Sequence, residues 1–236
     1  MKVKKNWTMR AAMILLALVL ITSCFVSGTF AKYVTAGKGS DSARVAKFGV
    51  EVTANGTMFA KEYATDDTDP DTVAAIAKSV ISSDDRKVVA PGTKGNMISM
   101  ALSGSPEVAV RVTYNATGKV QLTNWTQEDG SFYCPLNFKI GRVTIEGATY
   151  NSAALLQQAI ETEIMLYSKE YAPKTDLSAA GNDSLAISWE WPFETGANAG
   201  EKAANNIKDT YLGKRAADGN AAEVSIEVST TVTQID

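Results

Sequence analysis

The stretch SLAISWEWPF, Ser184–Phe193, alternates apolar residues with small or polar ones, which is the period of two of a β-strand. One face of this strand carries Leu185, Ile187, Trp189 and Trp191. Because large apolar side chains share that face, we expect it to lie against the core of the protein. The alternative is that Trp189 and Trp191, on either side of Glu190, form an exposed platform for carbohydrate.

The same alternation recurs along the chain, in short segments separated by turn residues such as Asn55-Gly56 and Pro91-Gly92. The candidate strands are Ala46–Val52, Met97–Leu102, Val108–Tyr114 and Val224–Val232, with a hairpin over Phe138–Ile145 around Gly141 and short strands near Trp125 and Phe132. Phe48, Val50 and Val52 share one face of the first, which predicts a half-buried strand. Many short strands with turns between them predict an antiparallel β-sandwich.

Three segments have the apolar spacing of a helix. The first opens at an acidic loop, where Asp69 suits the N-cap and Pro70 the first helical position, and continues with Val73, Ile76, Ala77 and Val80. The second is Asn151–Tyr171, with Leu156, Ile160, Ile164 and Tyr167 on one stripe. A short third helix is expected from Ala203 to Leu212, inside a Gly-, Ala- and Asn-rich insertion at 195–220. These helices fall in connections between strands, so the fold is predicted to be mainly β.

The amino terminus has the three-part layout of a secretory signal peptide. A basic region is followed by the apolar run Ala11–Ile21, and small residues precede a cut between Ala31 and Lys32. Residues 1–31 are therefore predicted to be removed, which makes the mature protein secreted or held at the cell surface. The alternative is a retained anchor, although the apolar run is short of the roughly 20 residues of a spanning helix.

A second processing site competes with the first. The residues before Cys24 resemble a lipoprotein box, in which Cys24 would be lipidated and become the first residue. Phe25 and Val26 continue the apolar character past this cysteine, whereas a lipidated cysteine usually leads into a polar tether. Cleavage after Ala31 is therefore the leading prediction, and lipidation at Cys24 is the alternative.

Residues 32–43 are rich in Gly, Ser, Thr and Ala and are expected to form a flexible arm ahead of a domain at 44–236. Tyr33 and Val34 are the only large apolar side chains of this arm. Two roles remain open for it. The arm either inserts into another subunit, with Tyr33 and Val34 as anchors, or acts as a spacer that keeps the cut site accessible.

Charge and composition exclude several classes of function. The chain has 23 basic and 26 acidic residues, and removal of residues 1–31 leaves 19 against 26, a net charge of −7. An acidic mature chain is poorly suited to nucleic acid, and contact with a membrane is expected only through an uncut signal. The sequence contains no His, so the Ser-His-Asp and Cys-His sites and the HExxH zinc motif are absent.

The remaining candidates for chemistry are weak, so we predict neither an enzyme nor a cofactor. Asp67, Asp69 and Asp71 could bind calcium weakly, but they lack the glycine and distal glutamate of an EF-hand loop. Glu190 and Glu194 are the faintest candidates for a pair of glycosidase carboxylates. Once Cys24 is removed, Cys134 has no disulfide partner, and we expect it to pack in the core.

The stretch VSGTFAKYVTAGKGSDSARVAKFGVEV, residues 26–52, resembles the amino termini of exported Gram-positive proteins that a SipW-type signal peptidase processes, the TasA and camelysin group. Three further stretches are similar to that group: VVAPGTKGNMISMALSGSPEVAVRV at 88–112, ISWEWPFE at 187–194 and STTVTQID at the end of the chain.

The resemblance implies a jelly-roll-like β-sandwich that assembles into extracellular fibres of a biofilm matrix. It also implies that the amino-terminal segment of each mature subunit completes a sheet of the next by donor-strand addition. Metallopeptidase activity, described for the camelysin branch, is not expected without His. The helix at 151–171 and the insertion at 195–220 depart from the group. A surface-displayed lipoprotein or adhesin-like binding module is the alternative function.

Overall fold

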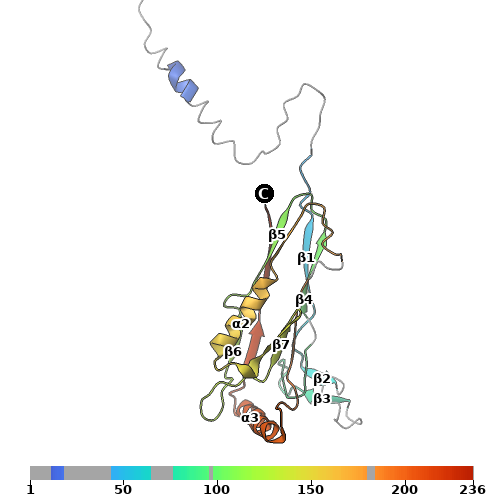
Figure 1. The fold of residues 1–236 in the computed structure, drawn as a ribbon, viewed down its shortest axis with the longest axis vertical. Helices are drawn as coiled ribbons and strands as arrows, with labels where there is room; N and C mark the ends of the chain where they lie inside the picture. Colours follow the sequence, from blue (N-terminus) through green and yellow to red (C-terminus); the bar gives the residue numbers. More distant parts are fainter. Residues whose placement is uncertain (1–11, 19–43, 65–76, 96–97, 180–183, 236) are drawn as a thin grey trace, which may run out of the picture. The chain divides into compact units, whose positions relative to one another are not determined.

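The computed structural model describes residues 12–18, 44–64, 77–95, 98–179 and 184–235. The chain divides into two compact units, Met1–Val45 and Ala46–Asp236. Residues 12–18 of the first unit are helical, and all the sheets belong to the second unit (Figure 1). In these described ranges, no helix combines the length and the apolar character needed to cross a membrane.

The largest sheet has five antiparallel strands in the order β1-β4-β10-β7-β8. Strand β10, Leu185–Glu190, lies at its centre and confirms the strand predicted from the opening stretch. It pairs with β4 (Ile98–Gly104) on one side and β7 (Asn137–Ile140) on the other. The edges are β1 (Val50–Asn55) and β8 (Val143–Glu146), the latter forming the predicted hairpin with β7.

Two segments of the chain, residues 110–123 and residues 223–234, pair with each other outside this sheet. Strand β5 (Val110–Asn115) pairs with β12 (Ser229–Gln234), and β6 (Val120–Thr123) pairs with β11 (Glu223–Ile226), all antiparallel. The single strand predicted at 224–232 is therefore wrong. Residues 116–119 lie between β5 and β6 while only residues 227–228 separate β11 from β12, so the two segments differ in length and the ladder breaks.

Two smaller pairings complete the sheets. Strand β9 (Lys169–Tyr171) lies on the other edge of β5, and β2 (Glu62–Ala64) pairs with β3 (Lys78–Ile81). The helix predicted after Pro70 is wrong at its end, because Val80 belongs to β3 and lies opposite the buried Tyr63. The start of that predicted helix lies outside the described residues.

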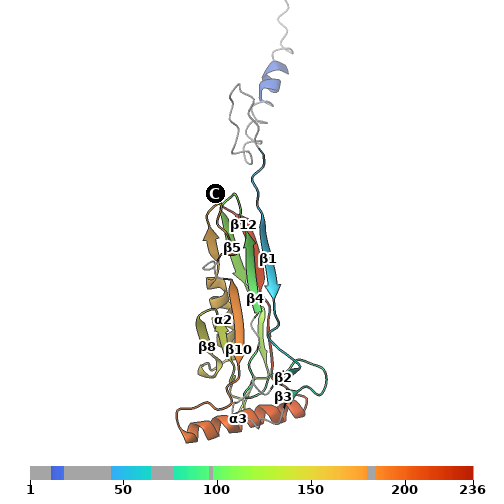
Figure 2. The same ribbon diagram turned by 90° about the vertical axis from the view of Figure 1, so that its right-hand side faces the viewer.

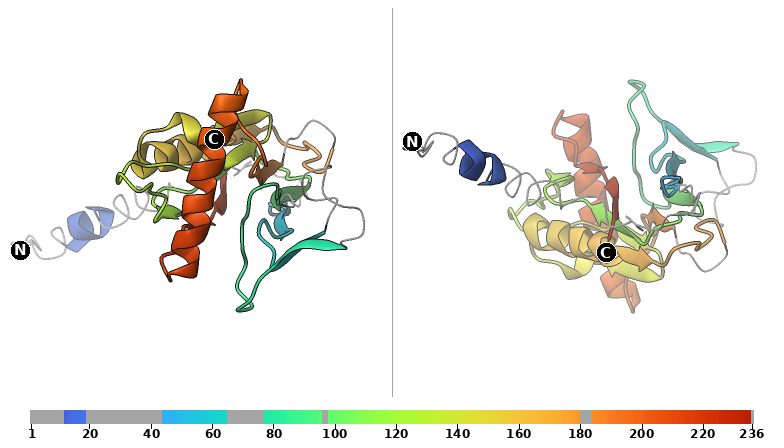
Figure 3. Two further views of the ribbon diagram at one scale, coloured as in Figure 1. Left: turned by 90° about the horizontal axis from the view of Figure 1, so that it is seen from below. Right: turned by 90° about the horizontal axis from the view of Figure 1, so that it is seen from above.

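The two long helices lie between strands, as predicted, but their bounds differ from the prediction. Helix α2, Ala153–Leu166, packs against β5 and β6 and ends before β9, so the predicted continuation to Tyr171 is wrong. Helix α3, Ala199–Ala217, begins earlier and ends later than predicted. Asn198 caps its start by accepting a hydrogen bond from the Glu201 N–H. Figures 2 and 3 show α3 lying across one end of the strands. A 3₁₀ turn, η3 (Gly147–Thr149), precedes α2.

The core lies between the five-stranded sheet and the strands β5 and β6, because inward side chains of both form one buried cluster. From the large sheet it includes Phe138, Ile140, Leu185, Ile187 and Trp189, and from the opposite strands Val110, Val112, Tyr114, Val120 and Leu122. The predicted α2 stripe of Leu156, Ile160 and Ile164 is fully buried against this cluster. The structure is thus rich in antiparallel strands with helices in their connections.

Strand β1 is much more exposed than the sequence predicts. Phe48, just before it, is 41% exposed and Val52 is 38% exposed, so the prediction of a half-buried face is wrong for these two residues. Val50 alone among the apolar residues of that face is half-buried. The physical reason is that β1 is an edge strand, and a regular alternation does not reveal whether anything covers the apolar face.

Candidate peptide-binding groove

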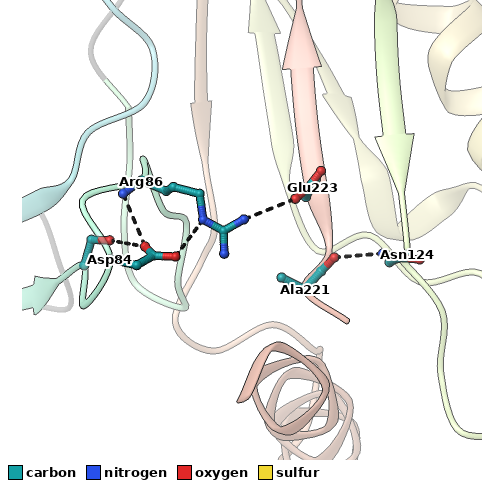
Figure 4. A network of polar contacts seen from close by, with 6 residues as sticks. Asp84, Arg86, Asn124, Ala221 and Glu223 are labelled. Carbon is teal, nitrogen blue, oxygen red and sulfur yellow. Dashed lines mark hydrogen bonds and ion pairs between the residues drawn. The ribbon is translucent and has the colours of Figure 1, made fainter. Parts of the chain in front are cut away.

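A groove of about 660 Å³ lies along β11 in the second unit. One wall is formed by residues 221–226, which lead into β11 and make up its whole length. The other wall is the turn that carries Asp84 and Arg86, together with Val88 and Val89. Figure 4 shows these two walls facing each other, with the Arg86 side chain between them.

The wall formed by β11 is an open strand edge. Within the described residues, β11 pairs with β6 and with no other strand. The Glu223 carbonyl accepts a hydrogen bond from Trp125 Nε1 at 2.9 Å, and the Glu227 N–H donates to the Lys119 carbonyl at 3.2 Å. The backbone N–H and C=O groups of the odd-numbered residues of β11 therefore point toward β6. Backbone groups alternate along a strand, so those of Val224 and Ile226 point into the groove.

The groove is lined by apolar and charged residues and by the polar residues Gln121, Thr123 and Ser225. Its apolar residues are Phe59, Val88, Val89, Ala216, Ala221, Ala222, Val224 and Ile226. Its charged residues are Asp84, Arg86, Lys87 and Glu223, two of each sign. An unpaired strand edge beside an apolar surface is the arrangement that binds an extended peptide, because the main chain supplies hydrogen bonds and alternate side chains enter the hollow.

The entrance to β11 is held in place by α3 and by the loop that follows β6. Asn124 Nδ2 donates to the Ala221 carbonyl at 3.1 Å (Figure 4), and Arg215 of α3 donates to the Asn124 carbonyl at 3.3 Å. Arg215 also donates to the carbonyl and hydroxyl oxygens of Thr126. Asn124 has a φ of 61°, in the left-handed region that Asn tolerates better than most residues. These contacts fix where the open edge begins.

The opposite wall is organised by Asp84. Its carboxylate accepts hydrogen bonds from the Ser82 hydroxyl at 3.0 Å and from Arg86 Nε at 2.6 Å. Arg86 Nη1 then reaches Glu223 Oε1 on β11 at 3.7 Å (Figure 4). The side-chain hydrogen bond from Arg86 lowers the pKa of Asp84, so this carboxylate remains ionised and keeps hold of the guanidinium.

Helix α3 is attached to the body partly by a buried carboxylate. Tyr133 Oη donates to Asp209 Oδ1 at 3.0 Å, and both side chains are buried. Trp191 Nε1 faces the same carboxylate without reaching hydrogen-bonding geometry. Burial raises the pKa of Asp209, and this effect is opposed by Tyr133, Trp191 and Lys208. Sequence patterns gave no sign of this contact, because Asp209 sits in a polar, Ala-rich segment that looks exposed.

Several predicted site residues lie outside the described residues. These are the cleavage pair Ala31 and Lys32, the arm anchors Tyr33 and Val34, the alternative lipidation site Cys24, and the acidic residues Asp67, Asp69 and Asp71. Among the described residues, no group of three or more Cys, Asp or Glu side chains is placed to hold a metal ion. The structure therefore leaves the cleavage, lipidation and calcium predictions as they stood.

The predicted residues that the structure does describe are mostly part of the core. Trp189 and Trp191 are 2% and 4% exposed, which confirms the core prediction and rules out the carbohydrate platform. Glu190 accepts from Asn137 at 3.3 Å, whereas Glu194 pairs with Lys202 at 3.1 Å, so each carboxylate serves a different contact. Cys134 is fully buried, as predicted, and burial raises the pKa of its thiol to about 12.

Neither a protein-family model nor a curated protein nor a solved structure matches this chain. The resemblance to the TasA and camelysin group therefore remains an expectation from the sequence. The groove along β11 was not predicted from the sequence. The one signal that pointed toward it is the apolar alternation in Val224–Val232, which marks a strand but not whether its outer edge is paired.

Proposed function

We propose that this chain is a secreted structural subunit of an extracellular fibre or biofilm matrix. In this proposal, a peptidase of the SipW type cuts after Ala31 and releases an arm, residues 32–43. The arm of one copy then adds as a strand to the domain of the next. The domain would be a jelly-roll-like β-sandwich in which a gap at one sheet edge is filled only in the assembly.

The observation that carries the proposal is the open edge of β11 beside an apolar groove. An unpaired edge of this kind is a liability that proteins usually cover or block with charge, because it pairs readily with other chains. Here Val224 and Ile226 direct backbone groups into the groove, and Phe59, Val88 and Val89 line it. A donated strand would satisfy those backbone groups and bury that apolar surface at once.

The dimensions of the two parts are compatible. The edge from residue 221 to residue 226 spans roughly 17 Å at about 3.3 Å per residue. The arm of residues 32–43 would reach roughly 40 Å when extended. One arm can therefore cover the edge and still leave residues to connect two subunits. A head-to-tail contact of this kind produces open filaments when the rotation between successive subunits does not close into a ring.

Electron microscopy of the mature chain tests this function directly. We expect the chain that begins at Lys32 to form filaments and the chain that begins at Arg44 to remain unassembled. A second test variant is Tyr33→Ser, which keeps the length of the arm but removes its larger apolar anchor. It should weaken assembly without lowering the melting temperature of the monomer. Equal filament formation by the chains beginning at Lys32 and Arg44 would overturn the donor-arm proposal.

Mass measurement separates this function from the alternative. A chain from the native host that begins at Lys32 supports the fibre subunit. A chain that begins at a diacylated Cys24 supports the surface-displayed lipoprotein or adhesin-like module instead, because the lipid would hold the arm at the membrane.

A further inference from the structure

We infer that Arg86 is a latch across the groove, and that strand addition at β11 has to release its ion pair with Glu223. This inference rests on the proposed function, because it concerns the regulation of the same groove. The ion pair would be a barrier to strand addition. The experiment below measures this barrier from the rate of filament elongation, separately from whether filaments form.

The latch connects opposite walls of the groove. Arg86 belongs to the turn on one side and Glu223 opens β11 on the other, and both residues line the groove. The Arg86 Nη1 to Glu223 Oε1 distance is 3.7 Å, and Figure 4 shows the guanidinium lying between the two walls. A peptide that pairs with the edge at Val224 must begin next to Glu223, where the guanidinium lies.

The Arg86 guanidinium contacts Asp84 through Nε and Glu223 through Nη1, and the two contacts differ in strength. Asp84 Oδ2 accepts from Arg86 Nε at 2.6 Å, which is a short charge-assisted hydrogen bond within one turn. The contact with Glu223 is longer, and the Arg86 and Glu223 side chains are 70% and 65% exposed. The side that crosses the groove is therefore the weaker one, so Arg86 can swing away from β11 while Asp84 still holds it.

An exposed ion pair is weak and is screened by salt. Such pairs change an equilibrium by about two- to five-fold at most, and the effect fades when the Debye length falls from about 10 Å at 0.1 M salt to about 3 Å at 1 M. The latch should therefore slow strand addition by a small factor at low ionic strength and by almost none at high ionic strength.

The test compares filament elongation by the mature full chain with that of two single variants and their double variant. Arg86→Met keeps most of the apolar stem of the side chain and Glu223→Gln keeps its shape, but each removes one charge of the pair. We expect each variant to elongate about two- to five-fold faster than the wild type in 0.05 M NaCl. The double variant should be no faster than either single one, and all rates should converge in 1 M NaCl.

The ion pair between Arg111 Nη2 and Glu170 Oε1 provides the matched control. It is 2.6 Å long, similarly exposed, and joins β5 to β9 away from the groove. Arg111→Met and Glu170→Gln should elongate at the wild-type rate at every salt concentration. Melting temperatures show which variants remain folded.

The outcomes separate the latch from the proposed function. Filaments that grow at equal or slower rates in Arg86→Met and Glu223→Gln at low salt would overturn the latch and leave the donor-arm proposal intact. An acceleration that persists unchanged in 1 M NaCl would also overturn it, since the cause would then not be an ion pair. Failure of the wild-type mature chain to form filaments under any condition would overturn both.

Discussion

The hydroxyl of Tyr133 donates a 3.0 Å hydrogen bond to the carboxylate of Asp209, which joins α3 to the loop before β7. Asp209 is 8% exposed and is the only buried acidic residue in the described part of the chain. Leu212 is the other buried residue of α3, so the Asp209 carboxylate is one of the two buried side chains through which this helix contacts the body. The attachment of α3 should therefore depend on the charge of Asp209.

Asp209→Asn should change how stability depends on pH. Burial raises the pKa of Asp209, so its stabilising contribution is present below the unfolded pKa, near 3.9, and is lost as the pH rises through the folded value. Relative to the wild type, the free energy of unfolding of Asp209→Asn should therefore increase between pH 4 and pH 7. Urea unfolding at several pH values measures this difference, and a difference that stays constant or falls would contradict the assignment.

Gly95→Ala should destabilise the domain by about 1–3 kcal/mol through overpacking. A Cβ on Gly95 would meet Trp189 Nε1 at 1.9 Å and the Met58 carbonyl at 2.2 Å, two groups that are already hydrogen-bonded to each other. Gly213→Ala is the control, because a Cβ there meets nothing within 4 Å and the position lies inside α3, about one turn before its end at Ala217. It should stabilise by about 0.5–1 kcal/mol. Thermal unfolding would contradict the geometry if both variants behaved alike.

Ile160→Ala should lower the free energy of unfolding by about 2–5 kcal/mol, because it leaves a cavity under α2. Ile160 is fully buried, whereas Leu166 on the same helix is 70% exposed. Leu166→Ala should therefore change stability by no more than about 0.5 kcal/mol. Chemical denaturation of the two variants checks the orientation of the helix, and a larger loss in Leu166→Ala would show that the outer face is packed.

Cys134 should be almost inert toward thiol reagents in the folded mature chain. The side chain is fully buried and burial raises the pKa of the thiol to about 12, so very little thiolate is present at pH 8. Labelling at pH 8 should be at least about a hundred-fold slower in buffer than in denaturing urea. Equal rates would mean that the region around Cys134 opens readily.

The elements that could be predicted from the sequence are those whose pattern determines the structure locally. Trp189 and its neighbours alternate over a whole strand with a single consistent face, and the α2 stripe repeats at helical spacing for several turns. The hairpin at Gly141 was predictable because glycine adopts a positive φ more easily than other residues, and Gly141 has a φ of 56°. A Cβ there would also collide with the Tyr167 hydroxyl.

The rest depended on partners that are distant in the sequence. Val80 fits a short helical pattern as well as a strand, and its pairing with Tyr63 decides between them. Val224 and Val232 look like one strand because nothing in their own alternation reveals the extra residues of the 116–119 loop opposite. The groove follows from the same kind of relationship, since an open edge is defined by the absence of a neighbouring strand. No local pattern carries that information.

Amide hydrogen exchange at Val224 and Ile226, compared between monomer and filament, is the most direct test of the proposal that β11 accepts a strand. If the arm of another copy pairs with this edge, both amides should exchange at least about ten-fold more slowly in filaments. The Ser225 amide, which already faces β6, should change little and serves as the internal control. Filaments in which Val224 and Ile226 exchange at their monomer rates would contradict the account.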